Sequence, residues 1–447
     1  MKIPSKPETF EAILPKLSDP ALLRRIVAVP GEAVGPAPGG KYRHWDTLRR
    51  ITPPAGLTAE EWWAAIKFAR LQTRRFVPLR DLRGRRFFYT MPDPALEMLH
   101  EIDQGASGRI ELPGSITNPQ TKDRYLRSSL IEEAITSSQL EGAAATRAQA
   151  KAMLRSGRRP VDHAERMILN NYHAIQFVGR RKGEKMTPKI VMEIHRIIAE
   201  DTLPPDSSPP HLRQPGDGIA VWDERDNLKV HQPPDASEIS GRMKALCLFA
   251  NRGSQEGFLH PVVRAILLHF WLAYDHPFID GNGRTARALF YWCMLRQGYW
   301  LAEFISISSI LRKAPASYGR SFLYTETDEG DLTYFILAQL RVICRSIEEL
   351  HAYIARKTGE IRAIDQILSA ATALNHRQKA LLVHSLRNPG FRYSIESHRN
   401  SHVVTYATAR SDLLALAEKG LLVKTRAGRA FAFAALPDLE DRLRALR

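Results

Sequence analysis

Apolar residues recur at helical spacing along much of the chain. The clearest stretches are 59–71, 124–140, 260–274 and 284–295. Two short apolar runs, 220–222 and 229–231, instead flank Asp226 and Asn227, which is the pattern of a β-hairpin. The pattern predicts a mainly helical protein with one small hairpin in its middle.

The C-terminal residues follow a second pattern. They comprise a helical stretch at 374–386, a turn at 388–390, a short helix from Ser394, a longer helix over about 403–419, and apolar runs at 421–423 and 430–433. The last two runs flank a basic turn, Lys424–Arg429, and so predict a second hairpin. Three helices followed by a hairpin predict a winged helix-turn-helix domain over residues 356–447.

Residues 1–105 are predicted to be an N-terminal extension, and their pattern does not indicate a role. Residues 30–40 are rich in Pro and Gly, which is typical of a loop or linker. Several arginines follow, and we expect them to face solvent rather than nucleic acid: Arg70, Arg74, Arg75, Arg80, Arg83, Arg85 and Arg86. The extension leaves residues 106–355 for a central helical domain.

Composition narrows the class of protein. The formal net charge is +16, and residues 356–447 hold 16 Lys and Arg against 8 Asp and Glu, which favours a polyanionic partner there. The three cysteines are far apart in apolar settings, so we expect buried thiols and neither disulfides nor a zinc site. The N-terminus lacks the apolar core of a signal peptide, and no apolar run is long enough to span a membrane. We expect a cytoplasmic protein without membrane contact.

The run His276–Arg287 gathers several groups that phosphoryl chemistry needs. A histidine can accept a proton near neutral pH, and Asp280 offers the oxygen ligand that Mg²⁺ prefers when it also holds phosphates. The turn Gly281-Asn282-Gly283 brings backbone N–H groups to a helix N-terminus, where an anion is stabilised. Arg284 and Arg287, three residues apart, can point at the same polyphosphate.

The whole run resembles the signature of the Fic family, His-Pro-Phe-x-(Asp/Glu)-Gly-Asn-Gly-Arg-x-x-Arg, and meets every fixed position. Fic proteins are helical enzymes that mostly transfer AMP from ATP to a hydroxyl side chain of a target protein. The resemblance implies that His276 is the general base, Phe278 a core anchor and Asp280 the Mg²⁺ ligand. It also implies that Gly281, Asn282 and Gly283 form the anion hole. A phosphorylating branch of the family has Lys at the second Gly of the turn, so Gly283 argues against that activity.

The resemblance assigns further roles to the arginines and to an upstream helix. Arg284 and Arg287 would grip the β- and γ-phosphates. The predicted helix over 124–142 ends in Ser137, Glu141 and Gly142, which match the family's inhibitory motif, (Ser/Thr)-x-x-x-Glu-(Gly/Asn). A glutamate in the last turn opposes the helix dipole, and such departures are expected near functional sites. The implied role of Glu141 is to pair with Arg287 and disturb binding of the ATP γ-phosphate.

Two more stretches resemble the family. The hairpin around Asp226 and Asn227 lies where Fic enzymes have a flap over the target side chain, and a hairpin edge can bind an extended peptide; a surface hairpin without that contact is the alternative. Residues 306–318 resemble the stretch that ends in a Tyr pair near the adenine. Gly319 replaces the second Tyr, so Tyr318 is a weak nucleotide-binding candidate.

The C-terminal stretch resembles winged helix-turn-helix domains found at the ends of many Fic proteins. In a DNA reader, the second helix of the motif would present Thr405, Tyr406, Thr408 and Arg410 to the major groove, and Arg426 and Arg429 could reach phosphates. Winged helices also serve in protein docking or dimerisation, so a homodimer stays open, and a basic surface can be merely solvated.

Taken together, the sequence predicts an autoinhibited protein adenylyltransferase that uses ATP and Mg²⁺. Its fold would be a helical Fic core with a hairpin flap and a winged-helix tail. Two alternatives remain. Relatives use the inhibitory glutamate to position water and remove AMP, so the site could catalyse de-AMPylation. Alternatively, the chain is a DNA-binding regulator whose Fic core senses nucleotide.

Overall fold

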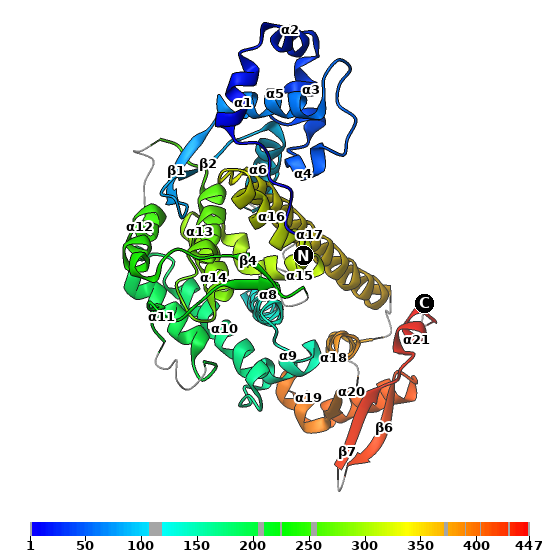
Figure 1. Ribbon diagram of the computed structural model, residues 1–447. Coiled ribbons are helices and arrows are strands. Elements are labelled where there is room, and N and C mark those ends of the chain that lie inside the picture. Colours follow the sequence, from blue (N-terminus) through cyan, green and yellow to red (C-terminus); the bar gives the residue numbers. More distant parts are fainter. Residues whose placement is uncertain are drawn as a thin grey trace. The chain divides into compact units, whose positions relative to one another are not determined.

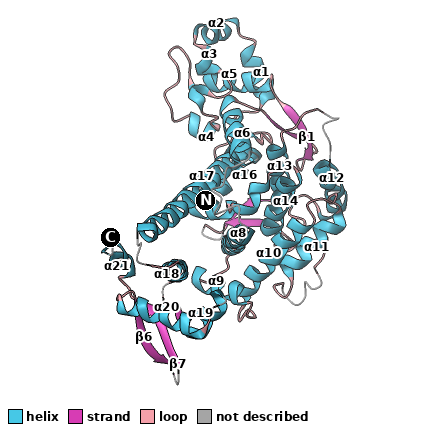
Figure 2. Cartoon of the chain, turned by 180° about the vertical axis from the view of Figure 1, so that it is seen from behind, coloured by secondary structure: helices cyan, strands magenta, loops and turns pink. Residues whose placement is uncertain are grey.

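The computed structural model describes residues 2–106, 119–203, 210–223, 226–251, 257–370, 374–388, 390–402, 404–427 and 430–445. The chain divides into two compact units, Met1–Leu350 and His351–Arg447 (Figure 1). Helices dominate both units, and the strands of the described ranges form two two-stranded sheets and one three-stranded sheet (Figure 2). The expectation of a mainly helical protein is confirmed.

The first unit begins with short helices and one hairpin. They are α1 (Phe10–Leu17), α2 (Pro20–Ala28), α3 (Gly31–Val34), the 3₁₀ turn η1 (Pro38–Gly40), α4 (Trp45–Leu48), α5 (Ala59–Leu71), β1 (Arg75–Arg80), β2 (Arg86–Tyr89) and α6 (Asp93–Ala106). The predicted helix α5 has the expected bounds and begins with a capping box between Thr58 and Glu61. Its tryptophans, Trp62 and Trp63, are the centre of a local apolar core.

Two expectations for this region need correction. The Pro- and Gly-rich segment 30–40 is not an open linker, because it forms α3 and η1 and packs on α5: Trp62 Nε1 donates to Ala33 O at 2.6 Å, and Arg70 Nε donates to Pro36 O at 3.0 Å. Arg70 is therefore buried rather than in solvent, although the arginines from Arg75 to Arg86 are exposed as expected.

A buried polar network joins this region to residues 328–334. Lys67 Nζ lies 2.6 Å from an oxygen of Asp328, and Tyr42 donates to Asp331 at 2.5 Å. Arg70 donates to the hydroxyl of Tyr334 at 2.8 Å. Both aspartates are almost fully buried, so they need these partners to offset their desolvation.

The central elements follow in chain order. They are α8 (Pro119–Leu140), α9 (Arg147–Ser156), α10 (His163–Arg180), α11 (Pro188–Ala199), β3 (Val221–Asp223), β4 (Leu228–His231), η3 (Ala236–Glu238), α12 (Ile239–Asn251), α13 (Pro261–Asp275), α14 (Asn282–Arg296), η5 (Trp300–Phe304), α15 (Ile307–Lys313), α16 (Pro315–Thr327) and α17 (Thr333–Ala370). The hairpin β3–β4 is antiparallel, with Asn227 at φ 44° in its turn, as its sequence predicted.

Helices α13 and α14 form the centre of this arrangement (Figure 1). Almost every side chain of α13 is buried, which its apolar sequence requires, and Pro261 occupies its first turn after the N-cap His260. Helices α10, α11 and α12 pack around this pair, and α8 packs against α10 and α15. The loop between α13 and α14 therefore lies between rigid helices.

The second unit contains the elements expected from its sequence, one more strand and one more helix. They are α18 (His376–Arg387), β5 (Arg392–Ser394), α19 (Ile395–His402), α20 (Tyr406–Glu418), β6 (Leu422–Ala427), β7 (Ala430–Ala435) and α21 (Leu439–Ala445). Strand β5 adds to the hairpin and gives the sheet order β5-β7-β6. Leu382, Leu413, Leu416 and Phe433 are completely buried in its core.

The residues singled out in this unit are placed as follows. Thr405 is the N-cap of α20, and its hydroxyl accepts the backbone N–H of Thr408 at 3.2 Å. Tyr406 and Arg410 are exposed on the first turns of α20, and Arg426 is exposed on β6. Arg429 lies outside the described residues.

Cysteine burial is close to expectation. Cys247 and Cys293 are buried, Cys344 is only half-buried, and all three are free thiols. Across the described ranges, no helix combines the length and the apolarity that crossing a bilayer would require.

Candidate active site

His276 ends α13 in an unusual backbone conformation. Its φ is 46° and its ψ is 57°, the left-handed region that costs a non-glycine residue about 1–2 kcal/mol. Its Nδ1 lies 3.2 Å from the carbonyl oxygen of Ala273. Because a carbonyl can only accept, this contact assigns the proton to Nδ1 and leaves Nε2 with a free lone pair. The imidazole is therefore prepared to accept a proton at Nε2.

Burial also keeps this imidazole neutral. It lowers the pKa of His276 from 6.5 to about 4, assisted by the positive charge of Arg213 and by His231 and opposed by Glu141. A base that is unprotonated across the neutral range is what removal of a proton from an alcohol requires.

The carbonyl groups around this turn all have named donors. Leu272 O accepts the N–H of His276, and Tyr274 O accepts from His231 Nε2 at 2.7 Å. Arg213 donates to the next three carbonyl oxygens. Its side chain donates to Asp275 O at 3.3 Å and to His276 O at 2.8 Å, and its backbone N–H donates to Pro277 O at 2.9 Å. Arg213 was not among the residues expected from the sequence.

The loop that follows is fixed from two sides. Phe278 is completely buried and stacks on His195 of α11, with ring centroids 3.6 Å apart. His195 Nε2 also contacts the carbonyl oxygen of Asp280 at 2.9 Å. Asn282 closes the loop, because its side-chain oxygen accepts the N–H of Phe278 at 3.0 Å and its amide donates to Phe278 O at 2.8 Å. The side chain of Asn282 thus holds the loop, and its backbone starts α14.

The turn Gly281–Gly283 leads into the N-terminus of α14. Gly281 is the N-cap with φ 81°, a value open mainly to glycine, and no side chain caps this helix. The first N–H groups of α14 are therefore without a side-chain acceptor at a positive helix end, which suits an anion.

Asp280 and Arg284 form an ion pair at this turn. Their closest atoms, Oδ2 and Nη2, are 3.0 Å apart, with the Asp280 side chain 49% exposed and Arg284 fully buried. Arg284 Nε is buried without a hydrogen-bond partner among the described residues. An accessible carboxylate beside an unsatisfied cationic donor fits a phosphate-bound Mg²⁺, which takes one or two protein carboxylates. In the described ranges no group of three or more His, Cys, Asp or Glu could hold a metal by itself.

Arg287 is engaged by the end of α8. Its Nη2 donates to Glu141 Oε1 at 2.7 Å and to Ser137 O at 3.0 Å, and its Nε donates to the hydroxyl of Ser137 at 2.8 Å. The Arg287 side chain is only 2% exposed. Gly142, with φ 91°, turns the chain away after Glu141. The pair expected from the sequence is therefore present in the structure.

The carboxylate of Glu141 also lies on the turn of the signature. A side chain at Gly283 would overlap Glu141 Oε1, and its Cβ would stand 2.9 Å from Glu141 Cδ and 3.1 Å from Arg287 Nη1. Glycine at 283 thus lets the carboxylate reach the N-terminus of α14. Glu141 occupies a place that favours a negative group.

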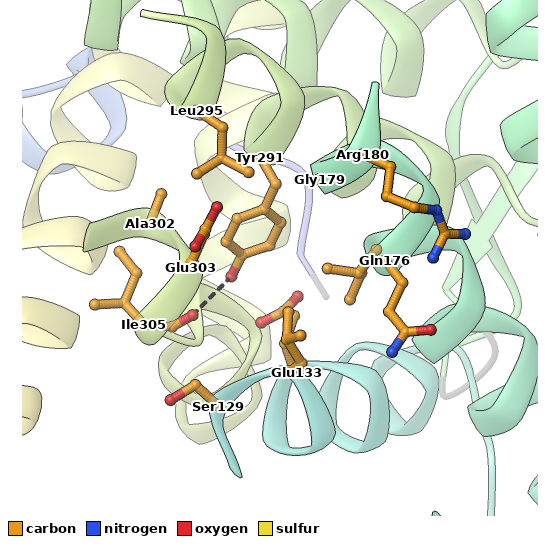
Figure 3. A pocket seen from close by; sticks show the side chains of 12 residues that line it. Ser129, Glu133, Gln176, Gly179, Arg180, Tyr291, Leu295, Ala302, Glu303 and Ile305 are labelled. Carbon is orange, nitrogen blue, oxygen red and sulfur yellow. Dashed lines mark hydrogen bonds between the residues drawn. The ribbon is translucent and has the colours of Figure 1, made fainter. Parts of the chain in front are cut away.

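A second carboxylate of α8, Glu133, anchors the same helix. Glu133, Ser137 and Glu141 are four residues apart and share one face. Glu133 accepts from the hydroxyl of Ser308 at 2.5 Å, its N–H at 3.1 Å and the hydroxyl of Ser306 at 2.8 Å. Burial raises its pKa. Figure 3 shows Glu133 and Tyr291 pointing toward one another at a pocket of about 290 Å³ between α8, α10 and α14.

Tyr318 has a different environment from the one expected. Its hydroxyl lies 2.8 Å from Nε2 of the buried His269, and burial raises the pKa of Tyr318 to about 12. The nearby charge of Arg287 opposes that rise. Tyr318 therefore lies behind Arg287 in this structure, and contact with a nucleotide stays a prediction.

Sequence reasoning missed three residues of the site: Arg213, His195 and Glu133. They lie 63, 81 and 143 residues before His276 in the chain, and no local spacing links them to it. A polar side chain within an otherwise apolar helix gave a signal only for His195, which lies among the isoleucines of α11.

Comparison with known proteins agrees with this geometry. Residues 185–294 match the Fic/DOC family. The chain is 26% identical over 271 residues to the protein adenylyltransferase Fic of Nematostella vectensis, covering 59% of this chain and 57% of that protein. It is 30% identical over 167 residues to the protein of the same name from Drosophila grimshawi, covering 36% and 32%.

The fold is similar to the crystal structure of a Fic family protein from Desulfovibrio desulfuricans G20. The TM-score is 0.54 at 18% identity, and the match covers 78% of this chain and 98% of that chain. The helical domain with this signature loop has a Fic-type fold, and residues 185–294 are the segment that matches the Fic/DOC family. The chain spans less than two thirds of the length of the two curated relatives given above.

Proposed function

We propose that this protein is a protein adenylyltransferase that moves AMP from ATP to a Ser, Thr or Tyr hydroxyl of a target protein and of itself. In this proposal Glu141 holds it inactive. The observation that carries the proposal is the engagement of Arg287 by Glu141 and Ser137 beside a neutral His276. The names of the relatives from Nematostella vectensis and Drosophila grimshawi support the choice of reaction.

The proposed reaction balances as follows. His276 Nε2 takes the proton of the acceptor hydroxyl, whose oxygen forms a bond to the α-phosphorus of ATP. The bond from that phosphorus to the bridging oxygen of the β-phosphate breaks, and pyrophosphate leaves. The N-terminus of α14, Arg284 and a freed Arg287 bind the phosphate chain. When bound at Asp280, Mg²⁺ supplies charge neutralisation for the phosphates.

Glu141 would inhibit by competing for Arg287. A hydrogen bond between charged groups contributes about 1.5–3 kcal/mol, which corresponds to a change of roughly 10- to 150-fold in the population of the free guanidinium. Without that guanidinium, the γ-phosphate loses a cationic partner and ATP binds in an unproductive pose.

The test is self-labelling with ATP carrying the label in its α-phosphate. We expect Glu141→Gly to label at least about tenfold faster than the unchanged chain, and His276→Ala to abolish labelling in both backgrounds. Glu132→Ala is the matched control, because Glu132 lies on the same helix but pairs with Arg147 at 2.7 Å. Equal labelling of Glu141→Gly and the unchanged chain would remove the inhibitory role.

The opposite direction of the reaction is tested with the same variants. If Glu141 positioned water for removal of AMP, the unchanged chain would release AMP from a modified target and Glu141→Gly would not. Because Glu141 is bound to Arg287, we favour inhibition, and we expect the unchanged chain to leave the modification in place.

A second candidate function concerns the C-terminal unit. We propose that it is a winged helix that binds DNA, because Tyr406 and Arg410 are exposed on α20 and Arg426 on β6. Binding through phosphates would weaken steeply between low and moderate salt. A salt-independent affinity in filter binding, or no affinity at low salt, would leave this unit as a docking or dimerisation module or a solvated basic surface.

A further inference from the structure

Arg213 makes several hydrogen bonds to the turn that carries His276. It lies in the segment between α11 and β3 and is buried, with 7% of its surface exposed. Its side chain donates to the carbonyl oxygens of Asp275, His276 and Pro234, and its backbone N–H donates to Pro277 O. One guanidinium therefore ties the end of α13 to the segment that follows the hairpin β3–β4.

The left-handed conformation of His276 depends on such a partner. In this conformation, the carbonyl groups of Asp275 and His276 converge on the same guanidinium. Two converging carbonyl dipoles repel each other, and a cation at the end of a helix stabilises both. Without it, rotation of the peptide after His276 relieves the repulsion and moves the imidazole with the backbone.

We propose that Arg213 is a positioning residue for the catalytic base: by holding the carbonyl groups of Asp275 and His276, it keeps the His276 imidazole in the orientation that accepts the proton of the target hydroxyl. The proposal rests on the proposed transferase function. It adds a residue that holds the backbone beside the base and that the signature does not contain.

The surroundings of His276 make the effect measurable. Arg213, His231 and Glu141 are the charged and titratable groups that act on it, and burial is the largest influence on its pKa, which lies at about 4. Loss of the guanidinium removes a positive charge, and release of the turn exposes the ring. Both changes raise the pKa of His276 toward the 6.5 of a free imidazole.

The experiment uses the full chain with Glu141→Gly. In that background we compare Arg213→Ala, Arg213→Lys and the control Arg264→Ala. Arg264 is also buried and donates to a carbonyl in the last turn of a helix, that of Phe249 in α12, but it lies 12 residues before His276 on α13. The measurements are kcat and KM for ATP and the NMR titration of the His276 ring.

We expect Arg213→Ala to lower kcat by roughly 10- to 100-fold with little change in KM for ATP, and to raise the pKa of His276. The kcat of Arg213→Lys should lie between those of Arg213→Ala and the parent, because a lysine keeps the positive charge but lacks the planar guanidinium with its several donors. Millimolar guanidinium should restore part of the activity of Arg213→Ala. Arg264→Ala should leave kcat and the titration unchanged even if it lowers stability.

An unchanged His276 titration in both Arg213 variants would overturn the proposal, as would a loss of kcat that Arg264→Ala reproduces. If Arg213→Ala does not fold, Arg213→Lys supplies the same two measurements. If the Glu141→Gly parent transfers no AMP, the proposed function fails, but the ring titration still decides whether Arg213 sets the environment of His276.

Discussion

At the scale of residues, the site depends on a few side chains whose charge state is set by burial. His276 is neutral because it is enclosed, and Nδ1 is committed to Ala273. Arg287 is charged and almost inaccessible, and it donates hydrogen bonds to Ser137 and Glu141 at the end of α8. In the proposed function, the base would therefore be ready before any ligand binds, whereas Arg287 would have to be released.

The charge state of His276 predicts the pH dependence of transfer. Its pKa of about 4 means that the ring loses its proton-accepting form only as pH falls toward that value. In Glu141→Gly, whose missing carboxylate had raised that pKa, we expect single-turnover transfer to be nearly constant from about pH 5.5 to pH 8. A fall with a midpoint near the free-imidazole value of about 6.5 would contradict a buried neutral base.

At the scale of elements, α8 connects Arg287 to the rest of the domain. Its one face carries Glu133, Ser137 and Glu141, which contact the stretch 306–308 and Arg287 of α14. The position of Glu141 therefore depends on how firmly Glu133 holds the middle of the helix. In the proposed inhibition, Glu133 would anchor the helix eight residues before the contact that Glu141 makes with Arg287.

Weakening that anchor should activate the enzyme in part. Glu133→Gln keeps the shape but removes the charge that accepts three hydrogen bonds from Ser306 and Ser308. A loss of about 1.4 kcal/mol would raise self-labelling roughly tenfold in a chain that keeps Glu141. The double variant Glu133→Gln/Glu141→Gly should be no faster than Glu141→Gly, and an additive gain in labelling assays would show that Glu133 acts by another route.

The elements also show where sequence reasoning succeeds. Helices α5 and α13 and the hairpin β3–β4 were predicted with nearly correct bounds, because their apolar periodicity and turn residues are local signals. The pairing of Glu141 with Arg287 was expected from two motifs. Arg213 and Glu133 were not, because their roles depend on carbonyl and hydroxyl groups distant in sequence that only the folded chain brings to them.

At the scale of the whole molecule, the two units differ in how well their sequence predicts a role. The first holds a complete signature and the residues that support it. The second has the expected helices and hairpin, but its exposed side chains are compatible with several partners. Residues 1–105 were expected to be an N-terminal extension of unknown role, and they lie in the same compact unit as the site. Composition did not reveal this, because the contacts that join them, such as the pair Lys67–Asp328 and the packing of Phe87 on Phe270, link residues distant in sequence.

The buried polar contacts after helix α16 matter for any attempt to shorten the protein. Near its start Tyr318 contacts His269 and lies close to Arg287, near its end Glu326 contacts His231 of the hairpin, and Asp328 follows next to Lys67. A truncated version that began at the family-matched segment would leave Asp328 without Lys67 and Asp331 without the hydroxyl of Tyr42. We therefore expect that removal of the first hundred residues would leave α16, and with it Tyr318 and Glu326 beside the candidate active site, less firmly held.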